Sequence, residues 1–284
     1  MDARPPREAG AFAQRLRAAV AGRGRLCAGI DPHPELLDAW GLPRTADGLA
    51  AFAGACAEAL GGHVAVVKPQ VALFEEYGSA GIEVLEQTIA RLRAAGALVV
   101  ADAKRGDIGS TMAAYARAWL GETSPLACDA VTAAPYLGFG ALEPAVGLAR
   151  SRGRGVFVLA RTSNPEGAGI QTAHVPGGAR PEDRRMVAQS IVDDAVAAGS
   201  GTVGLVVGAT RAHGLDLSGF DGPILAPGLG AQGASAGDLA DIFAGATELL
   251  LPNSSRAIVR AGPDVDAVRD AALRTRDAIE SALR

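Results

Sequence analysis

The sequence of 284 residues is poor in several features that would assign it to a specialised class of protein. Its three cysteines, Cys27, Cys56 and Cys128, are odd in number and widely spaced. They match neither a disulfide framework nor a zinc pattern, which indicates a reducing compartment. No apolar run approaches the roughly 18 residues of a membrane span, and residues 1–8 are too polar for a secretory signal. We therefore expect a cytoplasmic protein with no membrane partner.

Strong charge of either sign is also missing. The formal net charge is −4, which gives no general attraction to nucleic acid or to an anionic membrane. An anionic ligand would have to be bound by a local basic site. The composition, 49% hydrophobic and 20% charged, excludes general disorder and suits a globular protein with a large core.

Eight short apolar runs alternate with amphipathic segments along the chain. The runs lie at 26–30, 64–67, 97–101, 129–133, 155–160, 203–207, 223–226 and 248–251. The helical patterns lie at 8–21, 49–60, 82–95, 111–120, 142–149, 182–198, 239–244 and 265–283, with a short one starting at Thr210. Continuous apolar strands are typical of parallel sheets covered on both faces.

Eight such units predict an α/β fold, a (β/α)8 TIM barrel that occupies residues 1–284 as a single domain. Within it we expect an N-terminal helical extension at 1–24 and a long active-site loop at 164–181. An open doubly wound sheet is the alternative. That fold usually has a G-x-G-x-x-G turn after its first strand, and the sequence Gly29-Ile30-Asp31-Pro32 is not one.

Polar residues follow the predicted strands where a barrel of this kind gathers its function, at the carboxyl ends. Asp102 and Lys104 are two residues apart in the third strand and so point to the same side. Each polar residue alone has an ordinary structural explanation, such as a turn or a helix cap. Together they predict one ring of functional groups, formed by Asp31, Lys68, Asp102, Lys104, Ser163, Gln232 and Arg256.

The last two units predict a phosphate site. Residues 228–233, Gly-Leu-Gly-Ala-Gln-Gly, expose backbone N–H groups that can approach a ligand closely. Arg256 follows the next strand and can add a bidentate, charge-assisted contact. The loops after strands seven and eight are the common phosphate site of this fold.

Residues 102–111, Asp-Ala-Lys-Arg-Gly-Asp-Ile-Gly-Ser-Thr, resemble the D-x-K-x-x-D signature of the orotidine 5′-phosphate decarboxylase family. The resemblance extends to Asp31, Lys68-Pro69-Gln70, Ser163-Asn164-Pro165, the glycine-rich segment 227–233 and Ser255-Arg256. It therefore runs from about the first strand to the eighth. The spacing around Lys68 and the long loop after strand five are most similar to the longer bacterial branch of the family.

The resemblance implies a homodimer with shared active sites that converts orotidine 5′-monophosphate (OMP) to uridine 5′-monophosphate (UMP) and CO2 without cofactor or metal. It implies that Lys104 donates the proton to C6 and that Lys68, Asp102 and Asp107 complete a charged array, with Asp107 entering the partner's site. The substrate-binding residues that it implies are Asp31, Thr111, Ser163, Gln232, Arg256, Gly230 and Gly233.

The chemistry explains these residue types. Loss of CO2 leaves a carbanion in the plane of the ring, which the π system cannot delocalise, so the site must stabilise the charge electrostatically. Lys104, held charged by Asp102 and Asp107, does this and then supplies the proton. The loops 164–181 and 228–233 are candidate lids over the site.

Two other functions remain open. Sugar-phosphate decarboxylases and hexulose-phosphate synthases resemble the same family, but they need magnesium and a further carboxylate to bind it. A non-catalytic phosphate-binding barrel would explain residues 228–233 and Arg256. It would leave Lys68, Asp102, Lys104 and Asp107 without a role.

Overall fold

The eight expected strands form one closed parallel barrel in a computed structural model that describes residues 12–176, 184–199, 201–210, 213–229, 235–246 and 248–284. The open doubly wound sheet is thereby excluded. Around the barrel the strand order is β1-β10-β9-β8-β5-β4-β3-β2. The barrel strands are β1 (Cys27–Ile30), β2 (Val66–Pro69), β3 (Leu98–Arg105), β4 (Ala130–Ala133), β5 (Gly155–Arg161), β8 (Val203–Val207), β9 (Ile224–Pro227) and β10 (Leu250–Ser254).

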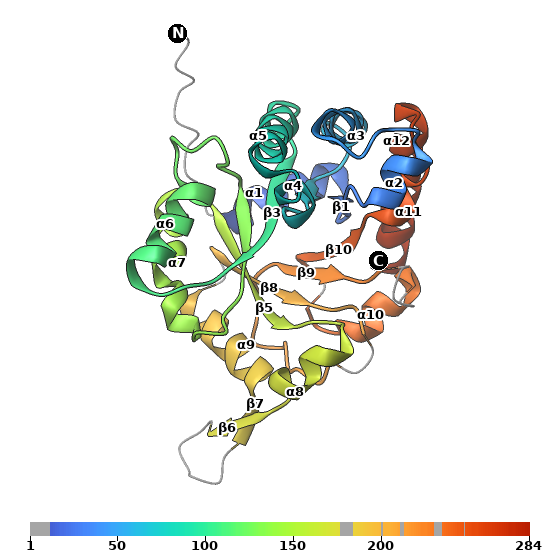
Figure 1. Cartoon of the computed structure of the whole chain (residues 1–284). Helices are drawn as coiled ribbons and strands as arrows, with labels where there is room; N and C mark the ends of the chain where they lie inside the picture. The colour runs from blue at the N-terminus through green and yellow to red at the C-terminus, as the bar shows by residue number, and fades with distance from the viewer. Residues whose placement is uncertain (1–11, 177–183, 200, 211–212, 230–234, 247) are drawn as a thin grey trace.

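Helices surround the barrel, as Figure 1 shows. They bury their apolar faces against the outward side chains of the strands, which form one large core cluster with them. The helices are α1 (Phe12–Arg23), α2 (Pro34–Ala39), α3 (Ala46–Leu60), α4 (Ala72–Glu75), α5 (Gly78–Ala94), α6 (Gly109–Leu120), α7 (Glu143–Ser151), α8 (Ala168–Gln171), α9 (Val187–Ala198), α10 (Leu239–Ile242), α11 (Arg256–Val259) and α12 (Val265–Ala282). Three short 3-10 segments are η1 (Phe139–Leu142), η2 (Pro165–Gly167) and η3 (Ala236–Asp238).

The barrel interior is filled by a second core cluster with a member from every barrel strand. Because successive side chains of a strand point to opposite faces, these inward positions recur every second residue. The cluster includes Cys27, Val66, Val100, Ala130, Phe157, Val206, Leu225 and Leu251. Two residues further along four of these strands lie Lys68, Asp102, Thr132 and Asn253. The interior therefore changes from apolar to polar toward the carboxyl end of the barrel.

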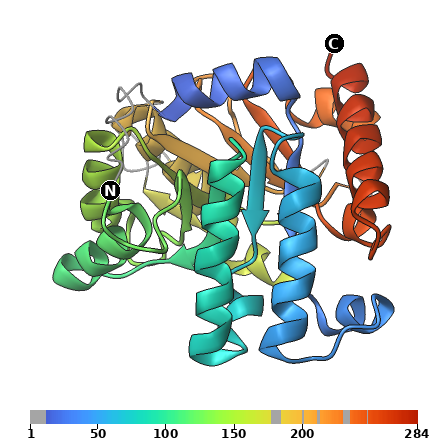
Figure 2. The same ribbon diagram turned by 90° about the horizontal axis from the view of Figure 1, so that it is seen from above.

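The amino end of the barrel is closed by α1, the expected N-terminal helix, which lies across it in deep blue in Figure 2. Phe12 and Leu16 of this helix belong to the interior cluster, and the Phe12 ring meets the Phe157 ring edge-on at 5.9 Å. A Cβ atom at Gly155 would lie only 2.5 Å from the Phe12 ring, so this close packing requires glycine there. Because α1 closes the amino end of the barrel, we expect a functional site at the carboxyl end.

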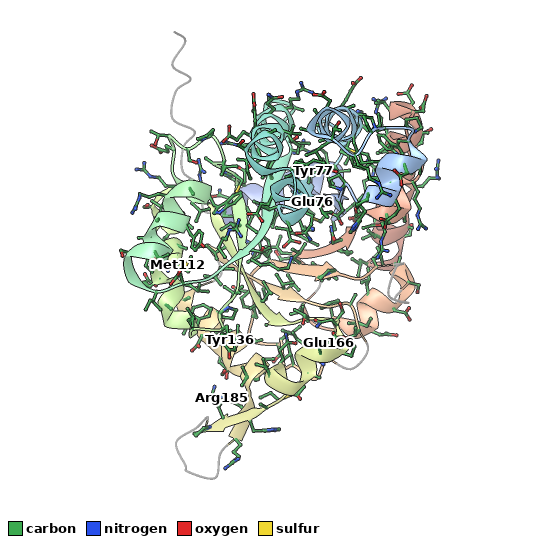
Figure 3. All side chains as sticks on the ribbon, viewed as in Figure 1. Glu76, Tyr77, Met112, Tyr136, Glu166 and Arg185 are labelled. Carbon is green, nitrogen blue, oxygen red and sulfur yellow. The ribbon has the colours of Figure 1, made fainter. Side chains whose placement is uncertain are left out.

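The segment after β5 is more ordered than the long loop predicted at 164–181. It contains η2, α8 and the strand β6 (His174–Pro176), which pairs antiparallel with β7 (Arg184–Met186). This hairpin projects from the body of the molecule in Figure 1 and carries Arg185, which is labelled in Figure 3. The helix predicted at 182–198 begins only at Val187, because the strand pairing extends through Met186.

The buried face of α9 is formed by Ala188, Ile191, Val192 and Ala195, whereas Val196 is exposed. The expectation of a short helix starting at Thr210 is wrong. No helix follows Thr210 within the described residues 213–219. There the backbone N–H of Leu215 donates to Nδ1 of His213, and Gly214 adopts a φ of +71°, which interrupts a helix.

None of the helices in the described part of the chain is long and apolar enough to cross a membrane.

Candidate active site

A pocket of about 310 Å³ opens at the carboxyl end of the barrel. Its floor continues the inward-facing positions of the strands, and its walls come from the loops after β5, β9 and β10. The lining residues are Asp31, Lys68, Gln70, Asp102, Lys104, Leu159, Thr162, Ser163, Asn164, Val206, Leu225, Pro227, Gly228, Leu229, Asn253, Ser255 and Arg256. Five of the predicted site residues with charged side chains therefore share one pocket with Ser163.

Asp102 is the hub of the charged groups, and its side chain is almost completely buried. Its Oδ2 accepts from Lys68 Nζ at 2.9 Å and from Gln70 Nε2 at 3.1 Å. Its Oδ1 accepts from Lys104 Nζ at 2.6 Å and from the Thr132 hydroxyl at 3.0 Å. One carboxylate thus joins two ammonium groups on neighbouring strands.

The two lysines on Asp102 are the only lysines in the sequence, since the remaining 25 of the 27 basic residues are arginine. Lysine and arginine are not equivalent. An ammonium is a compact charge that can give up a proton, whereas a guanidinium does not deprotonate in proteins. Both lysines of the chain line the pocket, where an ammonium could transfer a proton to a ligand. The Lys104 side chain is 47% exposed.

Lys104 meets Asp102 through a distortion of β3 and not along a regular strand. Ala101 pairs with Val131 and Arg105 with Ala133, so three β3 residues lie opposite Thr132 alone. This is a bulge, and within it Lys104 has a φ of +47°, the only positive φ of a non-glycine residue in the described chain. The prediction that Asp102 and Lys104 face the same side is confirmed, although the sequence did not indicate the bulge.

The charges around Asp102 stabilise one another. Burial is the largest single influence on Asp102 and acts to raise its pKa, but Lys68 and Lys104 together hold that pKa well below its usual range. Burial likewise opposes the charged form of Lys68, yet Asp31 and Asp102 raise the pKa of this ammonium above its usual value. Asp102 is therefore ionised, and Lys68 is charged, at neutral pH.

Asp31 completes this side of the pocket from the end of β1. Its Oδ1 lies 3.9 Å from Lys68 Nζ, and this buried oxygen makes no hydrogen bond in the structure. The Lys68 ammonium thus lies near two carboxylates. Within the described ranges, no group of three or more His, Cys, Asp or Glu side chains is arranged to hold a metal ion.

Cys27 lies beneath Lys68 in the barrel interior, but it offers no nucleophile. Burial raises the pKa of its thiol to about 12, an effect that the nearby Lys68 only partly offsets. The thiol therefore stays protonated at neutral pH and acts as a small apolar residue of the interior.

Ser163 and Arg256 line the pocket after β5 and β10 respectively. Ser163 follows β5, and its backbone packs so closely on Gly208 that a Cβ there would lie 2.9 Å from Ser163 N. The preceding residue, Thr162, is fixed by Gln171 of α8, whose Oε1 accepts from the Thr162 backbone N–H at 3.0 Å. Arg256 begins α11 and is exposed at the pocket rim.

The structure does not bring Asp107 and Thr111 into this pocket. Asp107 lies after the bulge of β3, and its Oδ1 accepts from the backbone N–H of Ile108 at 2.8 Å. Thr111 lies exposed in the first turn of α6. Their predicted roles therefore depend on a second copy of the chain.

Gln232, Gly230 and Gly233 lie outside the described residues, so their predicted roles stay predictions. The part of this loop that is described, Gly228 and Leu229, does line the pocket, and Gly228 has a φ of +107°.

The sequence interpretation did not assign a role to Gln70, Thr132, Asn253 or Ser255. All four extend the inward alternation of their strands, at two-residue steps from Lys68, Ala130, Leu251 and Asn253 respectively. Thr132 is also the only polar residue in the interior of its predicted strand. Strand parity together with that polarity would have identified them.

A sequence model described as the orotidine 5′-phosphate decarboxylase / HUMPS family matches residues 24–271. The chain belongs to this family. The match runs from the residue after α1 into α12, so it covers the whole barrel and every predicted site residue.

Relatives within the family are similar over most of their length. The orotidine 5′-phosphate decarboxylase of Salinispora arenicola is 57% identical over 267 residues, which cover 92% of this chain and 94% of the relative. The enzyme of that name from Salinispora tropica is 56% identical with the same coverage. The structure of the Leishmania donovani OMP decarboxylase is 30% identical, covers 96% of this chain and 99% of its own, and superposes with a TM-score of 0.75.

Proposed function

We propose that this chain is an orotidine 5′-phosphate decarboxylase, a carboxy-lyase that converts OMP to UMP and CO2. The observation that carries the proposal is the Lys104 ammonium, held 2.6 Å from the buried Asp102 carboxylate and exposed to the pocket. A fixed positive charge with a transferable proton is what a localised carbanion requires.

In the proposed reaction the bond between C6 and the carboxyl carbon breaks, and the electron pair stays on C6 as CO2 leaves. The ammonium of Lys104 stabilises this carbanion and then transfers one proton to C6, which gives UMP. The neutral amine regains a proton from solvent, for which its half-exposed side chain has access. Asp102 keeps the ammonium in place and disfavours the substrate carboxylate beside it.

The rest of the pocket binds the nucleotide in this proposal. Asp31 and Lys68 contact the ribose hydroxyls, which is supported by Asp31 Oδ1, a buried oxygen that makes no hydrogen bond in the structure. Ser163 contacts the pyrimidine edge. Arg256 and Gln232, with the backbone around Gly230 and Gly233, hold the phosphate, whose binding energy orients the reacting carbon from a distance.

We further propose that the chain acts as a homodimer whose partner supplies Asp107 and Thr111. The support is a set of large apolar side chains that are exposed beside these residues, Ile108, Tyr136 and Leu137. Tyr136, labelled in Figure 3, is 79% exposed. A second copy would cover this patch and bring a further carboxylate to each pocket.

The proposal also includes a single barrel domain and a cytoplasmic reaction that needs neither cofactor nor metal. The three cysteines are buried and unpaired, which suits a reducing compartment.

The test of the activity is an assay of the purified chain with OMP in excess chelator, following loss of substrate together with release of UMP and CO2. We expect full activity under these conditions. Absence of decarboxylation would contradict the proposal. Activity that is lost in chelator and restored by magnesium would favour the metal-dependent sugar-phosphate enzymes of the same family.

Shared sites are tested by mixing Lys104→Ala and Asp107→Ala, two variants that we expect to be inactive alone. If Asp107 acts in the partner's pocket, each mixed dimer regains one intact site, and random exchange restores about a quarter of wild-type activity. If Asp107 acts within its own chain, mixing restores nothing, and the shared-site proposal fails.

A further inference from the structure

Thr132 belongs to β4 and lies opposite the bulge of β3, without lining the pocket. We propose that it is a positioning residue, whose hydroxyl fixes both the Asp102 carboxylate and the backbone of Lys104 in the geometry needed for proton transfer. This inference rests on the proposed decarboxylase function and adds a residue to it.

The pairing of β3 with β4 explains why this position is special. Thr132 alone lies opposite Asp102, Ala103 and Lys104, because Ala101 and Arg105 pair with the residues on either side of it. A bulge of this kind disrupts the regular ladder of backbone hydrogen bonds. The backbone N–H of Lys104 instead donates to the Thr132 hydroxyl oxygen at 2.9 Å.

The Thr132 hydroxyl also donates a hydrogen bond of its own. Since a backbone N–H can only donate, the hydroxyl oxygen accepts from Lys104 and its proton remains for Asp102 Oδ1, 3.0 Å away. That same oxygen of Asp102 accepts from Lys104 Nζ at 2.6 Å. Thr132 therefore joins the two ends of Lys104, its backbone amide directly and its ammonium through the carboxylate.

The backbone of Lys104 needs such support. A φ of +47° is unfavourable for a residue with a long side chain, and it persists only where the surroundings impose it. Thr132 is 1% exposed on a barrel strand that is hydrogen-bonded on both sides, so its hydroxyl is a rigid anchor. Without that anchor Lys104 would be free to leave the left-handed region, and its ammonium would move relative to the pocket.

The first experiment compares Thr132→Val, which keeps the shape and loses the hydroxyl, with Thr132→Ser, which keeps the hydroxyl. We expect kcat for OMP to fall about 30-fold in the valine variant, because small misplacements of a reacting group are costly, while KM changes less than about threefold. The serine variant should recover kcat to within about threefold of wild type. Should the valine variant fail to fold, Thr132→Ala against Thr132→Ser makes the same comparison.

The matched control is Thr88→Val. Thr88 is also a buried threonine with a hydroxyl hydrogen bond, to the carbonyl oxygen of Val84 at 2.7 Å, but it lies in α5 on the outside of the barrel. We expect this variant to lose thermal stability without a change in kcat. An equal loss of kcat in the valine variants at 88 and 132 would reduce the role of Thr132 to stability and overturn the proposal.

A second experiment does not depend on activity. Because the chain has only two lysines, protein labelled with 15N-lysine shows only the backbone amides of Lys68 and Lys104. In Thr132→Val we expect the Lys104 amide to shift and to exchange faster with solvent, while the Lys68 amide stays close to its wild-type position. An unchanged Lys104 amide in the folded variant would overturn the proposal. Failure of the wild-type OMP assay would instead overturn the proposed function.

Discussion

Two buried aspartates at opposite ends of the barrel show how similar ion pairs can have different roles. Asp102, near the end of β3, is 8% exposed and bonded to Lys68 and Lys104. Asp129, just before β4, is 1% exposed and paired with Arg15 and Arg93. Each is paired with two cations, but Asp102 lines the pocket at the carboxyl end and Asp129 does not.

The two ion pairs differ in whether their cations can still contact a ligand. At the amino end, Asp129 also accepts the backbone N–H of Val99 at 3.1 Å, and α1, which carries Arg15, covers this end of the barrel. At the carboxyl end, the Lys104 side chain is 47% exposed among the described residues, and it lines the pocket. The arginines therefore join elements together, whereas the lysines offer a charge and a proton to a ligand.

The largest effect is expected where the free ammonium is removed. Lys104→Ala loses both the charge beside C6 and the proton donor, so kcat should fall by at least ~10⁴-fold, the order that loss of both contributions predicts. Because the groups assigned to ribose and phosphate remain, UMP should bind within about tenfold of its wild-type affinity. Steady-state kinetics and calorimetric titration with UMP measure the two quantities, and a variant that turns over normally would refute the mechanism.

The second largest effect is expected when Asp102 loses its charge. Asp102→Asn keeps the size of the side chain but leaves Lys68 and Lys104 without their common counter-charge, so that they repel one another. We expect kcat/KM for OMP to fall about 10³-fold, since the ammonium is no longer fixed. A loss smaller than tenfold in a folded variant would show that the carboxylate does not organise the site.

The same substitution at the other end should act on stability and not on chemistry. Asp129→Asn breaks a buried ion pair that joins α1 to the barrel, which costs about 3 kcal/mol in the free energy of unfolding. Chemical denaturation measures that loss, and kcat per folded molecule should stay within about twofold of wild type. If Asp129→Asn reduced kcat as much as Asp102→Asn, the distinction between the two ends would disappear.

The smallest effect is a difference in acid stability. The pKa of Asp102 is held below its usual value of 3.8, so its stabilising contribution is present above about pH 4 and declines as the pH falls through the folded-state pKa. The pKa of Lys68 is raised above its usual value of 10.5, so the stabilising contribution of its charge is present throughout the acid range and is lost only at higher, alkaline pH. Unfolding temperatures from pH 7 to 2.5 should therefore fall more steeply in wild type than in Asp102→Asn. Parallel curves would contradict the assignment.

The sequence was sufficient for the barrel because each strand is a short apolar run and each run is followed by a helical pattern. The hairpin of β6 and β7 was not predictable in the same way. Its strands have three residues each and no apolar run, and they are defined only by pairing with one another. Helix propensity in residues 184–186 gave way to that pairing.

The candidate site could be predicted where charge alone identifies a residue. Asp31, Lys68, Asp102, Lys104 and Arg256 all line one pocket, as the positions after their strands indicate. The bulge was not predictable, because the register of β3 is set by its neighbour β4 and not by its own residues. The position of Thr132 could have been found from its polarity and the strand alternation, but the role of its hydroxyl could not, because that role arises only opposite the bulge.

The central claim is that the ammonium of Lys104 acts on the carbon that loses its carboxyl group. A crystal structure of the chain with UMP tests it most directly. We predict that Lys104 Nζ lies within about 3.5 Å of C6 and that the phosphate lies within about 3 Å of the Arg256 guanidinium. A pyrimidine ring turned away from Lys104, or a phosphate bound elsewhere on the molecule, would contradict the account.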